Sequence, residues 1–273
     1  MADKSKFWRN PTGPRRAPVE AAATDADPID TGVVRIFGIH AVAAALANPK
    51  RQVTRLRLTE NAENRLEASV KERAATVERV HPRDLDRVLG EDTVHQGALL
   101  ETTPMEQPSL EELAAAAQTG GPLIVLDQVT DPHNVGAILR SAAVFEASGL
   151  IMTRRNAPPL SGALAKVASG ALEHVPVALV PNLARALTEL GELGIHRVGL
   201  DGEAELVVDD ATWGPGIALV LGSEGKGLRR LTRESCDVLV RIGGSAGMTS
   251  LNVSNAAAIA LHTASAHRRR RVG

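Results

Sequence analysis

Apolar residues in the second half of the chain are grouped in short runs that are rich in Val, Ile and Leu, and segments with helical periodicity lie between most of these runs. Runs without polar alternation are typical of strands buried on both faces, and strands that alternate with helices form parallel sheets. The pattern therefore predicts an α/β fold with a mostly parallel sheet and helices on both of its faces. The predicted strands are residues 123–126, 150–153, 175–180, 196–200, 217–221 and 238–242.

Shorter elements alternate in the first half of the chain, between residues 32 and 103. Their length and number predict a small, separate α/β domain. The predicted helices are residues 37–46, 62–75 and 82–89, and the predicted strands are residues 53–58, 76–80 and 97–101.

Two further segments divide the chain. Residues 1–31 contain four prolines and no apolar periodicity, so we expect a disordered tail. Residues 104–120 begin with a proline-flanked stretch and continue as a short helix, for which Ser109 and Glu112 form a capping box. We interpret this segment as the linker between the small domain, residues 32–103, and a larger domain, residues 121–273.

Composition narrows the classes of function. The chain has 273 residues, 44% of them hydrophobic, and a net charge of -1, so any RNA must be held by local basic patches. The single cysteine, Cys236, excludes an intrachain disulfide, and the eight histidines lack metal-ligand spacing, so we expect no metal. We find neither a membrane-length apolar run nor an apolar signal core, which predicts a cytoplasmic protein without membrane attachment.

Polar loop residues follow three of the predicted strands. Because the carboxyl ends of parallel strands meet at one edge of a sheet, these loops are expected to form one ligand site. The first loop leads into a helix that contains Asn134 and Arg140, and the second contains Glu224 and Lys226 among glycines. The third is the glycine-rich run 243–247, followed by Ser250-Leu251-Asn252-Val253-Ser254 and an alanine-rich helix, residues 255–267.

The glycines of these loops do not form a common phosphate cradle. No glycine follows Leu126 before Gly136, which excludes a dinucleotide-binding fingerprint, and residues 222–227 lack the spacing of a P-loop. Ser250 and Asn252 are good N-cap residues for the last helix, and Asn134 could likewise be a helix cap. Capping alone explains these residues as well as ligand binding does.

Taken in order, the three motifs resemble those of the SpoU (TrmH) family of RNA ribose 2′-O-methyltransferases, and the match extends over residues 121–267. The resemblance implies S-adenosylmethionine as the cofactor, bound in a deep trefoil knot that forms where the C-terminal segment threads a loop. It also implies that main-chain groups bind the cofactor. The expected positions are Gly222, Ile242 and Leu251, with Leu221 and Met248 as neighbours, although core packing also explains Ile242 and Leu251.

Arg140 resembles the catalytic arginine of the family. Because a guanidinium remains protonated, it is a poor base. We therefore expect Arg140 to bind the adjacent phosphate and lower the pKa of the 2′-hydroxyl, while phosphate or water takes the proton. A surface salt bridge is the simpler alternative for Arg140. The expected catalytic residues are Arg140, Asn134, Glu224, Ser250 and Asn252.

Expected RNA contacts lie in both domains. Lys226 and Arg229 lie beside the second motif, and Lys166 lies in a segment that resembles one near the active site of the family. Residues 38–42 and 95–97 resemble the L30e-like substrate-binding domain of the branch that methylates 23S ribosomal RNA. The basic cluster of this domain could contact phosphate or be a solvated surface. It consists of Lys50, Arg51, Arg55 and Arg57.

The sequence therefore favours S-adenosylmethionine-dependent methylation of a ribose, expected to be a guanosine, in 23S ribosomal RNA. Ribose methylation of tRNA is a second interpretation, and a non-catalytic RNA-binding or ribosome-assembly protein is a third. The joint presence of the polar motif residues counts against the third. Small residues along the helix at 255–267 would allow a second helix to approach closely, and family members pair through the knotted region, so we predict a homodimer.

Overall fold

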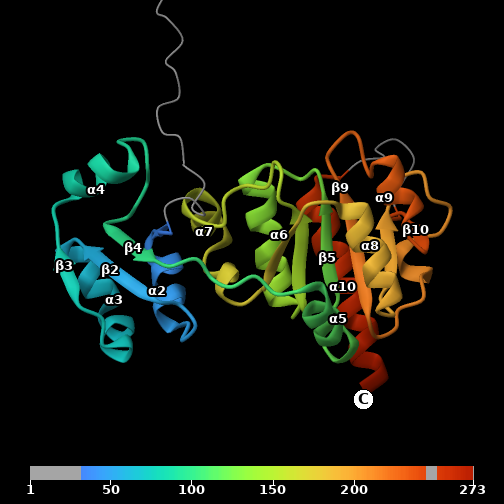
Figure 1. Ribbon diagram of the computed structural model, residues 1–273, viewed down its shortest axis with the longest axis horizontal. Helices are drawn as coiled ribbons and strands as arrows, with labels where there is room; N and C mark the ends of the chain where they lie inside the picture. Colours follow the sequence, from blue (N-terminus) through green and yellow to red (C-terminus); the bar gives the residue numbers. More distant parts are fainter. Residues whose placement is uncertain (1–31, 244–250, 273) are drawn as a thin grey trace, which may run out of the picture.

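The structure, a computed structural model, describes residues 32–243 and 251–272. Within these residues the chain forms a four-stranded sheet and a six-stranded sheet. The two sheets lie toward opposite ends of the long axis of the molecule (Figure 1). The predicted tail, residues 1–31, lies outside the described residues.

The four-stranded sheet has the order β1-β4-β2-β3, in which only β2 and β3 pair in parallel. The helix predicted at 37–46 begins later, because Phe37 ends a first strand that the sequence analysis did not predict. Gly38, with a φ of 91°, separates this strand from the helix. The elements are β1 (Val34–Phe37), α2 (Ile39–Ala47), β2 (Val53–Leu58), α3 (Glu60–Arg73), β3 (Val77–Arg79), α4 (Pro82–Leu89) and β4 (Ala98–Thr102).

The six-stranded sheet has the order β10-β8-β9-β5-β6-β7, and its strand pairings are parallel throughout the described residues. The prediction of a mostly parallel sheet is confirmed. The elements are α5 (Leu110–Thr119), β5 (Leu123–Asp127), α6 (Pro132–Val144), β6 (Gly149–Thr153), α7 (Gly162–Ala168), η1 (Ala171–Glu173), β7 (Val177–Val180), α8 (Leu183–Glu192), β8 (His196–Leu200), η2 (Val208–Asp210), β9 (Ile217–Gly222), α9 (Arg230–Glu234), β10 (Val238–Val240) and α10 (Val253–Val272).

Helices cover both faces of this sheet (Figure 1). In β5, Leu123 and Val125 pack with α5 and α8, whereas Ile124 and Leu126 pack with α6 and α10. Because successive side chains of a strand point to opposite faces, an uninterrupted apolar run is what burial on both faces requires.

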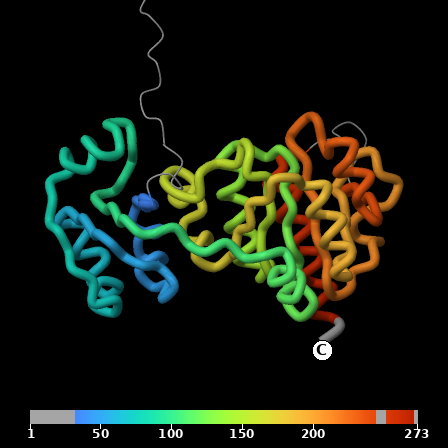
Figure 2. The backbone as a smooth tube through the Cα atoms, in the orientation of Figure 1, coloured from blue at the N-terminus to red at the C-terminus, as the bar shows by residue number. Residues whose placement is uncertain are grey.

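The connection between the two parts is shorter than the predicted linker. The capping box of Ser109 and Glu112 is confirmed, and it starts α5. Leu113 of α5 packs into the core of the larger part, so the second half of residues 104–120 belongs to that core. Figure 2 shows the chain crossing between the two parts between β4 and α5.

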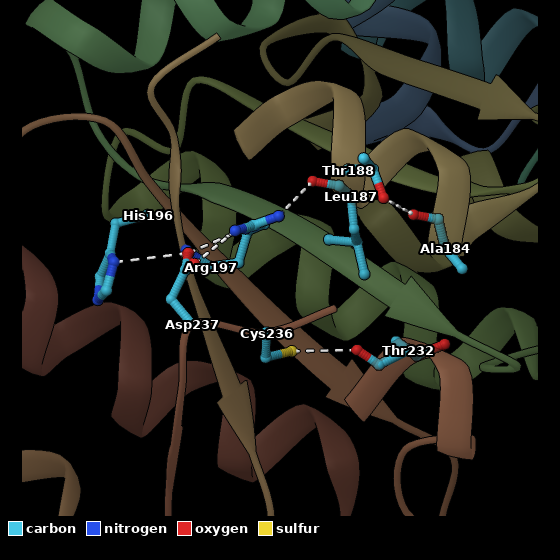
Figure 3. Close-up of polar contacts among 8 residues, drawn as sticks. All are labelled: Ala184, Leu187, Thr188, His196, Arg197, Thr232, Cys236 and Asp237. Carbon is cyan, nitrogen blue, oxygen red and sulfur yellow. Dashed lines mark hydrogen bonds and ion pairs between the residues drawn. The ribbon is translucent and has the colours of Figure 1, made fainter. Parts of the chain in front are cut away.

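The amino edge of the parallel sheet carries a polar cluster at the start of β8 (Figure 3). Arg197 donates from Nε to Asp237 at 2.9 Å and from Nη1 to the carbonyl of Leu187 at 3.0 Å. A second guanidinium nitrogen, Nη2, completes a bidentate pair with the Asp237 carboxylate. Hydrogen bonding by Arg197 lowers the pKa of Asp237.

Candidate active site at the carboxyl edge of the parallel sheet

One carboxylate joins the three predicted motifs. Glu224 Oε1 accepts hydrogen bonds from Asn134 Nδ2 at 3.1 Å and from Asn252 Nδ2 at 2.5 Å. The two amides also contact each other, since Asn252 Nδ2 donates to Asn134 Oδ1 at 3.0 Å. Residues from distant parts of the sequence thus meet at the carboxyl edge of the sheet.

Local sequence places both asparagines at helix starts. Asp131, not Asn134, caps α6: its carboxylate accepts from the His133 N–H at 2.9 Å. The alternative interpretation of Asn134 as a cap is therefore wrong. Asn252 does act as a cap, because its Oδ1 accepts from the Ser254 N–H at 2.9 Å. The same side chain still donates from Nδ2 to the network, so capping and site formation coexist at this residue.

The loop after β9 is a tight turn. The Gly227 N–H donates to the carbonyl of Ser223 at 2.9 Å, and Gly225 and Gly227 have positive φ angles. A Cβ atom at Gly222 would lie 2.1 Å from the carbonyl carbon of Gly227. Only glycine allows this close return of the backbone, which presents Glu224 at the tip of the turn.

Asp127 anchors the far end of this loop. It is the last residue of β5 and is opposite Gly222 in the strand register. Its buried carboxylate accepts from the backbone N–H of Arg229 at 2.9 Å and from Arg229 Nε at 2.6 Å. Two donors of Arg229 are therefore committed within the protein. The RNA contact predicted for this residue is left to its Nη groups.

Two of the predicted cofactor positions, Gly222 and Ile242, lie on either side of the end of β8, which stops at Leu200 between β9 and β10. Gly222 ends β9 and Ile242 follows β10, and strands two apart in a sheet are separated by about 9–10 Å. Leu221 is buried beneath them, whereas the Leu251 side chain is 45% exposed. Met248 and Ser250 lie outside the described residues.

The main chain at these positions suits an adenosine group. Within residues 32–243 and 251–272, the backbone N–H and C=O groups of Ile242 and Leu251 have no hydrogen-bond partner. Unpaired main-chain donors and acceptors, together with an exposed apolar residue such as Leu251, are what a planar, polar-edged base requires. The residues present fit the cofactor implied by the sequence.

Arg140 is not part of the Glu224 network. It lies in the second half of α6, about 9 Å along the helix axis from Asn134 and about 120° around it. Its side chain is exposed and makes no hydrogen bond or ion pair with the described residues. The alternative of a surface salt bridge finds no support in this part of the chain.

The predicted RNA contacts are placed differently. Lys226 is exposed at the tip of the second loop. Lys166 lies at the junction of the two parts, because a Cβ atom at Gly38 would lie 3.7 Å from its Cγ. In the predicted basic cluster, Arg57 is buried and pairs with Glu101 at 2.9 Å. Arg51 is likewise buried and paired, so both interpretations of the cluster are wrong for these two residues.

The thiol of Cys236 contacts the carbonyl of Thr232 and is not part of the Glu224 network. Burial raises the pKa of the Cys236 thiol to about 12, which keeps it protonated and poorly nucleophilic at neutral pH. In the part of the chain that the structure describes, no three His, Cys, Asp or Glu residues are grouped to hold a metal ion. No helix among these residues is long and apolar enough to cross a membrane.

Sequence reasoning missed Asp127 as a site residue. The available signal was a lone carboxylate directly after a fully apolar strand, a position where burial demands a partner.

Fold and site together define a parallel α/β protein that presents amides, a carboxylate and main-chain groups at the carboxyl edge of its sheet. Residues 121–262 match the family model of the SpoU rRNA Methylase family, and residues 35–108 match the model for RNA 2'-O ribose methyltransferase substrate binding. The chain belongs to the SpoU rRNA methylase family.

Curated relatives extend the match over most of the chain. The 23S rRNA (guanosine-2'-O-)-methyltransferase RlmB of Pseudomonas putida is 40% identical over 239 residues, which cover 84% of this chain and 95% of the relative. The RlmB protein of Shewanella oneidensis is 41% identical over 241 residues, covering 86% and 97%.

Solved structures show the same fold. The SpoU methyltransferase AviRb from Streptomyces viridochromogenes, in complex with AdoMet, has a TM-score of 0.75 at 23% identity and covers 90% of this chain and 94% of its own. An AdoMet-bound rRNA methyltransferase from Sinorhizobium meliloti has a TM-score of 0.74 at 22% identity, covering 88% and 89%. Residues 244–250 lie outside the described residues, and the trefoil knot stays a prediction.

Proposed function

We propose that this protein transfers a methyl group from S-adenosylmethionine to the ribose 2′-oxygen of a guanosine in 23S ribosomal RNA. The observation that carries the proposal is that Asn134 and Asn252 both donate a hydrogen bond to the same carboxylate oxygen of Glu224. Both curated relatives described above are named for this reaction. The protein acts where ribosomal RNA is made, in the cytoplasm.

The cofactor supplies an electrophilic sulfonium methyl group. Its adenosine part would be held by the main chain at Gly222, Ile242 and Leu251, with Leu221 and Met248 as neighbours. The unpaired backbone groups of Ile242 and Leu251 support this assignment. Gly222 keeps the second loop close to its strand, so that main-chain groups and no side chain stand at this position of the proposed cofactor site.

Arg140 and the network of Asn134, Glu224 and Asn252 have different roles at the ribose. The guanidinium of Arg140, unpaired among the described residues, binds the phosphate next to the target nucleotide and lowers the pKa of its 2′-hydroxyl. Glu224 Oε1 holds the two amides, and Oε2, which has no partner in the described residues, accepts a hydrogen bond from the ribose. Phosphate or water takes the proton, because arginine cannot. Ser250 completes the catalytic set.

Residues 32–103 bind the RNA as an L30e-like domain, and residues 121–273 carry out the reaction. Lys226, Lys166 and the Nη groups of Arg229 contact phosphates. The active unit is a homodimer that pairs through the knotted region, and the exposed apolar side chains of α6 and α10 add to the contact. Val144 and Ile259, which are 73% and 39% exposed, belong to this surface.

Mapping of ribose methylation tests the proposal. Purified protein, S-adenosylmethionine and unmethylated 23S ribosomal RNA should give one new 2′-O-methylguanosine. Arg140→Ala should abolish transfer while calorimetry shows cofactor affinity within a few-fold of the wild type. Arg185→Ala, which removes an exposed arginine of α8, is the matched control and should remain active.

Three results would contradict the proposal. Methylation of tRNA alone would assign the protein to the second interpretation given by the sequence. Absence of any heat on titration with S-adenosylmethionine would favour a non-catalytic RNA-binding protein. Full activity of Arg140→Ala would remove that residue from the mechanism.

A further inference from the structure

A buried ion pair connects the two parts of the molecule. Arg51, in the loop between α2 and β2, donates from Nη2 to Glu173 Oε1 at 3.0 Å and from Nε to Glu173 Oε2 at 3.0 Å. Glu173 ends η1 of the larger part. The two side chains are only 5% and 4% exposed. Asn48 Nδ2 adds a further hydrogen bond to Glu173 Oε2 at 2.7 Å.

Arg51 is fixed by its own part of the molecule. The Arg51 N–H donates to the carbonyl of Asn48 at 3.1 Å, and the Arg51 carbonyl accepts from Arg73 at the end of α3. Three segments of the smaller part, the end of α2, the following loop and the end of α3, therefore meet at Arg51. A rotation of this part on the larger one cannot occur without separating Arg51 from Glu173.

Close packing extends from η1 through α7 to α6, the helix that carries Asn134 and Arg140. At the start of η1, a Cβ atom on Gly170 would lie 2.5 Å from Ala44 Cβ of α2. Along α7, a Cβ atom on Gly136 of α6 would lie 2.7 Å from Val167 Cγ1. Gly136 lies between Asn134 and Arg140 in the sequence of α6. The smaller part therefore rests on α7 and η1, and α7 rests on the helix that carries the proposed catalytic residues.

Interfaces between domains of one chain usually permit relative motion. A buried ion pair adds little net stability, because desolvation of the charges offsets their attraction, and apolar replacement of both partners is often neutral or stabilising. A rotation of one part on the other that keeps the interface closed, however, would leave a buried charge without its partner. The pair therefore penalises wrong orientations more than it stabilises the fold.

We propose that Arg51 and Glu173 are positioning residues that hold the RNA-binding part in one orientation, so that bound RNA presents its target ribose to Arg140. This inference rests on the proposed function. The two residues act through the placement of the RNA and do not touch the reacting atoms.

Two variants of the full chain separate positioning from stability. Glu173→Gln leaves the Arg51 charge buried without a counter-ion, and it should lower the melting temperature and raise the KM for 23S ribosomal RNA. The double variant Arg51→Met, Glu173→Leu removes both charges, so its melting temperature should recover. Its KM should stay raised by about tenfold, because apolar contacts do not specify one orientation. Affinity for S-adenosylmethionine and kcat at saturating RNA should change by less than about threefold in both variants.

Glu67→Gln is the matched control, because it breaks an exposed pair with Lys71 in the same part of the molecule and should alter neither quantity. Small-angle X-ray scattering should show a larger maximum dimension for both Glu173 variants than for the wild type. If the double variant recovers both its melting temperature and its KM, the pair serves stability alone and the proposal is wrong. Unchanged scattering of both variants would also overturn it. A wild-type protein without activity would refute the proposed function, whereas the scattering comparison would still test the orientation.

Discussion

Replacement of Asp127 by Asn tests whether the site depends on the anchor of its second loop. The Asp127 side chain is fully buried and holds both the backbone and the guanidinium of Arg229. An asparagine has the same shape but only one acceptor oxygen, and its NH2 group would face a donor of Arg229. The loop that presents Glu224 would then keep only one of its two hydrogen bonds between position 127 and Arg229.

The expected loss of stability follows from the two hydrogen bonds. Hydrogen bonds to charged groups contribute about 1.5–3 kcal/mol each, which bounds the loss at about 3–6 kcal/mol. The Arg229 side chain is 52% exposed, so water replaces part of what it loses. With one acceptor also retained, we expect a decrease of about 2–3 kcal/mol in the free energy of unfolding. For a chain of this size, this corresponds to a decrease of about 4–12 °C in melting temperature.

Thermal unfolding and turnover should both be measured on Asp127→Asn. Turnover should decrease with stability, because Glu224 no longer has a fixed position relative to Asn134 and Asn252. Glu234→Gln is the control: it breaks the exposed Arg230–Glu234 pair one turn away and should change the melting temperature by under about 2 °C. A variant with wild-type stability and turnover would show that the loop keeps its position without the buried carboxylate.

Two further predictions concern the edges of the sheet. Gly222→Ala should reduce the affinity for S-adenosylmethionine measured by calorimetry, because the new Cβ atom displaces the backbone of Gly227. Gly225→Asn is the control and should retain binding, because no atom lies within 4 Å of its Cβ position. Asp237→Asn should lower the free energy of unfolding by about 1–3 kcal/mol at pH 7. Because Arg197 lowers the folded-state pKa of Asp237, this contribution is present above the unfolded pKa of about 4 and is lost as the pH decreases further. A difference between wild type and variant that persists unchanged at pH 2 in urea titrations would contradict the assignment.

Much of the parallel sheet could be predicted from the sequence, because its central strands carry uninterrupted apolar runs such as residues 217–221. The missed strand, Val34–Phe37, has only four residues, and Arg35 is exposed on it. Its strand character depends on antiparallel pairing with β4, which is distant in the sequence. Local patterns contain no information on such pairing, so Phe37 was assigned to the following helix.

The sequence predicted which loops lie together at the candidate site. It did not predict the contacts that hold these loops in place. Asn134, Glu224 and Asn252 were chosen as motif residues, and the structure brings them into contact. Arg229, expected to bind RNA, also pairs through Nε with a carboxylate about a hundred residues earlier in the chain, which leaves its Nη groups for the predicted contact. A basic residue beside a motif has the same sequence signature whether or not it also pairs within the protein, so the contact with Asp127 could not be predicted from the sequence.

The hydrogen bonds among Asn134, Glu224 and Asn252 fix the relative positions of these side chains but contribute little to the stability of the fold. Glu224 and Asn252 are exposed, and hydrogen bonds between exposed side chains compete with water, so their net contribution to folding is small. The interactions that matter most for stability are those of the buried Asp127 carboxylate and the close approach of the backbone to Gly222. Neither involves the amide groups of Asn134 and Asn252. A buried anchor that fixes an exposed carboxylate is the arrangement expected where the outer group must meet a substrate in a set position. The stability of the loop and the chemistry of its tip are therefore assigned to different residues, which is why Asp127 and Glu224 variants should differ in whether they unfold the protein or only inactivate it.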